Sequence, residues 1–270
     1  MVFYASLVFV AGLILGSFLN VCIHRIPRDL SVVTPRSFCP ECGTQITWRH
    51  NIPILSYLLL RGRCAYCGHP IPVRYPVVEL VTGFVFLLIA YRYGLTWPAL
   101  KWALLAALLI VLFFTDLEER LLIDECTLGG SLAGLVLAIF VAVPGVFADV
   151  IFPDANPRIQ SLFNAVLGAA LLALPIWAMG ALWSRVRQRE ALGFGDVKLL
   201  AMLGIFLGPE NGIFALTIGA VAGAVVGTAI ALGTRKSVRS YELPFGSFLC
   251  VAAILVVVVR APSGGVLGVP

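Results

Sequence analysis

Charged side chains are scarce in this chain, and that scarcity limits the kinds of protein it can be. Lysine, arginine, aspartate and glutamate together make up 12% of the 270 residues, whereas hydrophobic residues make up 60%. The mean hydropathy of +0.99 excludes an ordinary water-soluble domain. Apolar runs suited to crossing about 30 Å of hydrocarbon recur along the chain. The composition therefore predicts an all-α polytopic membrane protein, surrounded by membrane lipids.

Eight apolar stretches are predicted to be transmembrane helices, and the second and sixth are short. They lie near residues 2–20, 77–91, 98–115, 126–143, 161–183, 197–208, 212–233 and 244–260. The sixth stretch ends at the helix-breaking pair Gly208-Pro209, so Asp196 at its start is expected below the membrane surface. We expect three parts: a first transmembrane helix over 1–20, a soluble insertion over 21–76 and a transmembrane part over 77–270.

The basic residues are distributed unevenly between the two sides of the membrane. With eight helices, 15 of the 19 lysines and arginines fall in loops on one side. The positive-inside rule puts this side in the cytosol and both termini outside. The net charge of +5 then follows from topology, and we expect no nucleic-acid binding. The first 19 residues lack a basic start and a small-residue cleavage site, which favours a retained helix over a signal peptide.

Four of the seven cysteines form two Cys-x2-Cys pairs in the insertion. Two such pairs can complete a tetrahedral sulfur site for zinc, and four thiolates leave no open position for catalysis. Two disulfides are the alternative, but disulfides rarely persist in a reducing compartment. The insertion is too polar to bury a core, so the metal would supply its folding energy. The predicted ligands of this structural zinc are Cys39, Cys42, Cys64 and Cys67.

Asp116 and Asp196 each lie where an apolar stretch meets polar residues. Taken alone, Asp116 could belong to a solvated turn, and Asp196 could cap a helix N-terminus. A carboxylate at membrane depth is costly, however, and two adjacent carboxyls that share a proton can activate water for attack on a peptide carbonyl. From helix polarity we expect the resting charge on Asp196 and the proton on Asp116.

The residues around the two aspartates are predicted to support them. Gly193 and Gly195 would let a substrate backbone or a partner helix approach closely, although a flexible loop is the simpler interpretation. Lys198 is expected to reach the membrane interface with its ammonium group. Asp124, eight residues after Asp116, is expected to have a supporting role.

Motifs spread over nearly the whole chain resemble those of the bacterial type IV prepilin peptidases, which are intramembrane aspartic proteases of the G-x-G-D kind. The matching segments include Gly16-Ser17-Phe18-Leu19-Asn20, both cysteine pairs, Asn51-Ile52-Pro53, Asp116-Leu117, Gly193-Phe194-Gly195-Asp196-Val197-Lys198 and Pro244-Phe245-Gly246. One position departs from the family pattern, because Ile123 stands before Asp124 where a proline is usual.

The resemblance implies an enzyme of the bacterial inner membrane with Asp116 and Asp196 as its catalytic pair. Such enzymes remove the basic leader from prepilins and pseudopilins of type IV pili and type II secretion, typically after a glycine at the cytosolic face. Many then methylate the new N-terminal amine with S-adenosylmethionine. The candidates for contacting this donor are Arg61, Gly62, Arg63 and Glu79. For Glu79 the alternative is an acid in the first turn of a helix, and the chain lacks a Gly-rich nucleotide fingerprint.

Two other functions stay open at this point. Another G-x-G-D protease with a different substrate would carry the same aspartates. A proton-coupled transporter could also use them, with the zinc loop as a regulatory part. Transporters often contain internal repeats, and we find no convincing repeat here.

Overall fold

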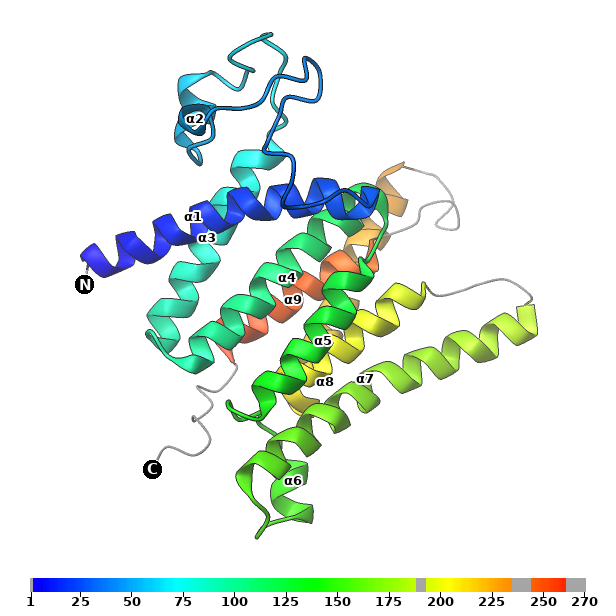
Figure 1. The fold of residues 1–270 in the computed structure, drawn as a ribbon. Helices are drawn as coiled ribbons and strands as arrows, with labels where there is room; N and C mark the ends of the chain where they lie inside the picture. The colour runs from blue at the N-terminus through cyan, green and yellow to red at the C-terminus, as the bar shows by residue number, and fades with distance from the viewer. Residues whose placement is uncertain (1, 188–192, 235–243, 261–270) are drawn as a thin grey trace. The chain divides into compact units, whose positions relative to one another are not determined.

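The computed structural model describes residues 2–187, 193–234 and 244–260, and these residues form helices and loops without a β-strand (Figure 1). The elements in chain order are α1 (Val2–Arg25), η1 (Ile26–Arg28), η2 (Trp48–His50), α2 (Leu55–Leu59), α3 (Arg74–Tyr93), α4 (Trp97–Glu119), α5 (Asp124–Ala138), α6 (Val146–Ile151), α7 (Pro157–Arg187), α8 (Phe194–Thr234) and α9 (Phe245–Val259). The predicted all-α fold is confirmed.

Every predicted transmembrane stretch falls on a helix. The helices are α1, α3, α4, α5, α7, α8 and α9, and the sixth and seventh predicted stretches are the two parts of α8. Among the residues that the structure describes, five helices are long and apolar enough to cross a membrane: α1, α3, α4, α7 and α8. Helices α5 and α9 have 15 residues each, which is fewer than the roughly 20 that a straight crossing needs.

Helix α8 is broken at the predicted position. Gly208 has φ 75° and ψ 177°, which lies outside the helical region, and Pro209 follows it. The segment before the break crosses α7 with backbone contact. A Cβ on Gly204 would overlap the carbonyl group of Gly168. Small residues at such crossings let membrane helices pack closely.

The chain divides into two compact units, residues 1–94 and 95–270. In the first unit α1 packs along α3, and the loop region from residue 26 to residue 73 connects them. In the second unit α8 packs against α5, α7 and α9, and α9 also packs against α4. The boundary between the two units thus lies after the end of α3, at residue 94. The boundary predicted from the change from a polar to an apolar sequence was near residue 77.

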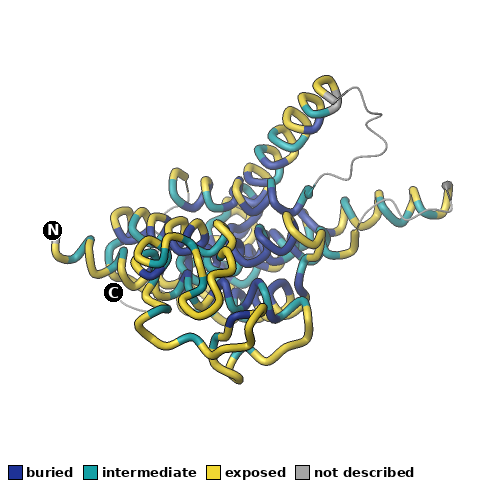
Figure 2. The backbone as a smooth tube through the Cα atoms, turned by 90° about the horizontal axis from the view of Figure 1, so that it is seen from above, coloured by how far each residue is buried: buried dark blue, intermediate teal, exposed yellow. Residues whose placement is uncertain are grey.

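Buried residues of the second unit gather in α4, the first part of α8 and α9. Leu105, Leu200 and Phe206 are completely buried. The C-terminal parts of α7 and α8 are mostly exposed (Figure 2), and their exposed residues include large apolar side chains such as Trp183 and Val225. Exposed apolar helix faces of this kind suit contact with lipid chains rather than water.

Candidate active site and metal site

Asp116 lies in the last turn of α4 and is buried, with 6% of its surface exposed. Helix α4 ends at Glu119, and Arg120 follows in the left-handed conformation with φ 57°. Glu118 and Glu119 are exposed. A solvated turn therefore describes the residues after Asp116 but not Asp116 itself.

Ser247 holds the Asp116 carboxylate from the start of α9. Its backbone N–H donates to Oδ2 of Asp116 at 2.6 Å, and its hydroxyl donates to the same oxygen at 2.7 Å. Because α9 begins at Phe245, the N–H of Ser247 is one of those that lack a partner within their own helix. Asp116 supplies that partner and so fixes the end of α4 against the start of α9.

Asp196 lies in the first turn of α8, two residues after the helix begins. Its N–H already donates to the carbonyl of Gly193 at 3.1 Å, so Asp196 is not the N-cap. Oδ2 of Asp116 lies beside Gly246 at the start of α9, and Leu122 packs against both Gly246 and Gly195, the residue before Asp196. Cys250 is completely buried in α9. Since α9 packs against both α4 and α8, it brings the two aspartates to one site.

Leu122 packs where the three helix ends meet. A Cβ on Gly195 would lie 2.9 Å from Cβ of Leu122, and a Cβ on Gly246 would lie 3.0 Å from its Cδ2. The same added atom on Gly246 would lie 3.2 Å from Oδ2 of Asp116. Glycine at these two positions therefore leaves room for Leu122 and for the carboxylate.

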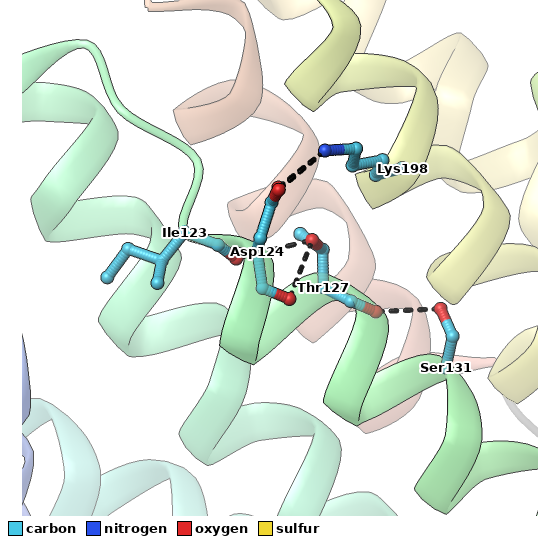
Figure 3. Close-up of polar contacts among 5 residues, drawn as sticks. All are labelled: Ile123, Asp124, Thr127, Ser131 and Lys198. Atoms are coloured by element: carbon cyan, nitrogen blue, oxygen red, sulfur yellow. Dashed lines mark hydrogen bonds and ion pairs between the residues drawn. The ribbon is translucent and has the colours of Figure 1, made fainter. Parts of the chain in front are cut away.

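An ion pair joins α5 to the N-terminal part of α8 (Figure 3). Nζ of Lys198 lies 2.7 Å from both carboxylate oxygens of Asp124, and it also lies 5.0 Å from the ring centre of Phe194. Asp124 is the first residue of α5, where the helix dipole favours a negative charge. Lys198 thus has a protein partner. It follows Asp196 by two residues in α8, so the ion pair lies near that aspartate.

The structure brings most of the predicted supporting residues to this end of the second unit. Asp124, Gly195 and Lys198 contact neighbouring elements there, and the exposed Gly193 has its Cβ position 4.0 Å from Oδ2 of Asp196. Sequence reasoning missed three residues of the site: Leu122, Ser247 and Cys250. Ser247 directly follows the Pro244-Phe245-Gly246 motif, which was the only indication of its position.

The two cysteine pairs form one cluster in the first unit. The sulfur atoms of Cys39, Cys42, Cys64 and Cys67 all lie within 4.8 Å of one another. The sulfurs of Cys39 and Cys67 are 3.9 Å apart, close to the roughly 3.8 Å between sulfurs around a tetrahedral zinc. No disulfide joins these four cysteines. The predicted cluster is confirmed, and its donor set could hold zinc.

Both pairs use the same backbone turn. The N–H of Gly43 donates to the carbonyl of Cys39 at 2.9 Å, and the N–H of Gly68 donates to the carbonyl of Cys64 at 3.0 Å. Each turn is closed by a further bond, from Cys39 N–H to Thr44 and from Cys64 N–H to His69. The repeated geometry aims two sulfurs from each turn at one point.

The pKa values of three of the four thiols are shifted, and not all in the same direction. Hydrogen bonds from the hydroxyl and the N–H of Thr44 lower the pKa of Cys42 to about 6, and the N–H groups of Tyr66 and Cys67 lower the pKa of Cys64. The N–H of His69 favours a Cys67 thiolate, but partial desolvation and the three neighbouring sulfurs raise its pKa to about 12. A metal cation would favour the thiolate at every position.

The candidate residues for the methyl donor have separate local roles. Glu79 is buried in α3 and accepts a hydrogen bond from the N–H of Ile54 at 2.8 Å. Because α3 begins at Arg74, Glu79 lies beyond the first turn, and the helix-dipole interpretation is wrong. Arg61 and Arg63 are exposed, and the N–H of Gly62 donates to Tyr57 in the turn that leads to the second cysteine pair. Contact with a donor stays a prediction for all four residues.

The structure is that of a helical membrane protein in which two aspartates, Asp116 and Asp196, lie at the ends of helices that both pack against α9. The profile of the Type IV leader peptidase family matches residues 103–228, and that of the Bacterial Peptidase A24 N-terminal domain matches residues 10–93. The chain belongs to the type IV leader peptidase family, and it is a peptidase of that family.

Relatives from several bacteria carry the name "Prepilin leader peptidase/N-methyltransferase". The protein from Aeromonas hydrophila is 36% identical over 273 residues, which cover 92% of this chain and 88% of the relative. The protein from Klebsiella pneumoniae is 39% identical over 76% of this chain and 86% of its own length. The Myxococcus xanthus protein is 42% identical over 87% of this chain, which spans 65% of that relative. No solved structure shows a significant match.

Proposed function

We propose that this peptidase is an intramembrane aspartic endopeptidase that removes the basic leader from type IV prepilins and pseudopilins. The cut would follow a glycine at the cytosolic face of the bacterial inner membrane. The observation that carries this proposal is that Asp116 and Asp196 lie at the ends of two helices that both pack against α9, with Leu122 packed between Gly195 and Gly246 beside them. The names of the relatives support prepilins as the substrates.

The two carboxyls would divide the proton chemistry of peptide hydrolysis between them. One carboxylate takes a proton from water, the water oxygen attacks the scissile carbonyl carbon, and the other carboxyl gives its proton to the leaving amine. Two hydrogen bonds from Ser247 to Oδ2 of Asp116 favour negative charge on that oxygen. They argue for charge on Asp116 and the proton on Asp196, the reverse of the assignment predicted from helix polarity.

The first unit would supply the second activity. The relatives' names support N-methylation of the new N-terminus after cleavage, with S-adenosylmethionine as the methyl donor. The four cysteines would bind a structural zinc that orders the loop region between α1 and α3. The uneven distribution of basic residues supports a cytosolic location for this region and for the aspartates, with both termini outside.

Cleavage of a prepilin in detergent tests this proposal directly. Purified protein is incubated with a prepilin that has a Gly-Phe junction, and the products are identified by mass. We expect the wild type to cut after the glycine and Asp116→Asn and Asp196→Asn to lose at least 1,000-fold in rate, roughly the scale of losing a member of a catalytic pair. Asp149→Asn, at an exposed position in α6, should cut normally.

Two results would contradict the proposal. Absence of cleavage by the wild type would leave another substrate or a transport function. Undiminished cleavage by both aspartate variants would place the peptidase chemistry elsewhere. The mass of the mature N-terminus with and without S-adenosylmethionine tests methylation independently.

A further inference from the structure

A cavity of about 690 Å³ lies along α1 within the first unit. Its walls come from one side of α1, from residues 32–37 and from residues 51–53. The part of α1 that lines it is mostly apolar, and two of its residues, Ile14 and Phe18, are 60% and 47% exposed. Neither the acid pair nor the four cysteines line this cavity.

The cavity has the length and the polarity of one lipid leaflet. Its lining runs along α1 from Val10 to Arg25, a rise of about 22 Å, and half of a bilayer with its headgroups is about 20–22 Å thick. The end near Val10 is apolar, whereas Arg25 and Arg36 line the other end. Helix α1 is itself long and apolar enough to cross a membrane, so the apolar end would face lipid chains.

Arg25 carries a buried positive charge without a carboxylate partner among the residues that the structure describes. Its side chain is 6% exposed in α1, and it donates to the carbonyl oxygens of Ser31 at 2.8 Å and Arg36 at 3.4 Å. These neutral acceptors satisfy hydrogen bonds but do not cancel the charge, and a buried charge is costly unless an opposite charge compensates it. Arg36, at the same end, is exposed and adds a second positive charge.

We propose that this cavity binds an anionic glycerophospholipid, with its phosphate at Arg25 and Arg36 and an acyl chain along the apolar side of α1. Arginine matches phosphate oxygens in charge and in planar geometry. The exposed Val33, which also lines the cavity, would extend the contact with lipid chains. The basic leader of a prepilin would be repelled at this end, and S-adenosylmethionine would bring its positive sulfonium towards two arginines.

Headgroup preference tests the proposal on the full chain. The protein is purified in a nonionic detergent, stripped of lipid and mixed with phosphatidylglycerol or phosphatidylcholine of identical acyl chains, and retained lipids are counted by native mass spectrometry. We expect the wild type to prefer phosphatidylglycerol about 30-fold, and Arg36→Gln to reduce that preference about fivefold. Arg25→Gln combined with Arg36→Gln should remove it.

Two further variants keep the test decisive if Arg25→Gln does not fold. Arg25→Lys retains the charge and should keep most of the preference. Ile14→Trp fills the apolar end and should reduce retention of both lipids. The matched control is Arg49→Gln, because Arg49 is an exposed arginine of the same unit that packs over Trp48 and does not line the cavity.

Three outcomes would overturn the proposal. The first is a wild type that retains both lipids equally. The second is an Arg49→Gln variant that loses preference as much as Arg36→Gln does. The third is displacement of the retained lipid by S-adenosylmethionine in the wild type but not in the double arginine variant, which would make the cavity a donor site.

Discussion

The Asp116 carboxylate depends on two hydrogen bonds from one residue, and only one of them can be removed by mutation. In Ser247→Ala the backbone N–H stays, while the hydroxyl that donates to Oδ2 at 2.7 Å is lost. A hydrogen bond to a charged group contributes about 1.5–3 kcal/mol. We therefore expect kcat for prepilin cleavage to fall at least tenfold with little change in KM, as measured by steady-state kinetics.

The control for this variant is Ser131→Ala in α5. The hydroxyl of Ser131 donates to the carbonyl of Thr127 at 2.7 Å, so its loss removes a hydroxyl of the same unit without touching Asp116. Restored kcat in Ser247→Thr would support a role for the hydroxyl itself. Normal kcat in Ser247→Ala would mean that the N–H alone holds the carboxylate.

At the scale of single residues, the two aspartates could be predicted from the sequence, but the residue that binds the Asp116 carboxylate could not. Asp116 and Asp196 could be found because charges beside long apolar stretches are rare. Ser247 lies 131 residues from Asp116 in the chain, and nothing in local composition indicates that α9 packs between α4 and α8. The resting charge that we propose differs from the one predicted from helix polarity for the same reason, because Ser247 could not be placed from the sequence.

At the scale of elements, α7 and α8 cross with direct backbone contact. A Cβ on Gly204 would overlap the backbone of Gly168, so Gly204→Ala must push the helices apart. We expect a loss of about 1–3 kcal/mol in stability, the range typical of overpacked cores. Thermal unfolding in detergent should show a Tm several degrees lower than that of the wild type.

Gly129→Ala is the matched control, because a Cβ there would meet nothing within 4 Å. Gly129 lies inside α5, where alanine is the better helix former, so its Tm should stay the same or rise slightly. Equal Tm values for the two variants would show that α7 and α8 can separate at no cost.

The Asp124–Lys198 pair connects α5 with the turn that carries Asp196. Its side chains are 56% and 20% exposed, so solvent screening limits its contribution to about 0.2–1 kcal/mol. If the pair positions Asp196, Asp124→Asn and Lys198→Met should each lower kcat by up to about fivefold. The double variant should be no slower than the slower single variant, since both substitutions break the same contact.

Glu125→Gln removes a neighbouring exposed charge of α5 and serves as the control. It should leave kcat unchanged. Additive effects of Asp124→Asn and Lys198→Met would mean that the two residues act separately, for example on the substrate, and would remove the positioning role.

The presence of the helices could be predicted from the apolar runs in the sequence. The break in α8 could be predicted from the adjacent Gly208 and Pro209. The ends of the helices could not be predicted as well. Helix α1 continues to Arg25, five residues beyond its expected end at residue 20, because the polar residues there find partners in the loop region. Arg120 ends α4 in a left-handed conformation, which apolar periodicity does not reveal.

At the scale of the whole molecule, the chain combines a unit that holds a cluster of four cysteines with a unit that holds the two aspartates. The motifs for both could be predicted, because cysteine spacing is a local pattern and four thiols have few other uses. Sidedness stays a prediction from charge. The cavity along α1 could not have been predicted, since it forms only when residues 32–37 and 51–53 fold back against the helix.

Removing the metal should affect one unit and spare the other. Zinc binding supplies folding energy to small domains that bury little apolar surface, and the loop region between α1 and α3 is mostly exposed. We expect about one zinc per chain by mass spectrometry. After chelation, trypsin should cut the loop at exposed arginines such as Arg49 and Arg61, while its cuts in the second unit, at Arg120 for example, should stay as they were.

Cysteine variants separate this effect from chelation damage. Cys39→Ser should lose the zinc and reproduce the trypsin pattern of the chelated protein, because it removes one of four sulfurs that lie within 4.8 Å of one another. Cys126→Ala, which changes a cysteine of α5 outside that group, should keep the zinc. An unchanged trypsin pattern after complete chelation would mean that the loop region holds its shape through the hydrogen bonds of its two turns, and that the metal has a role other than folding.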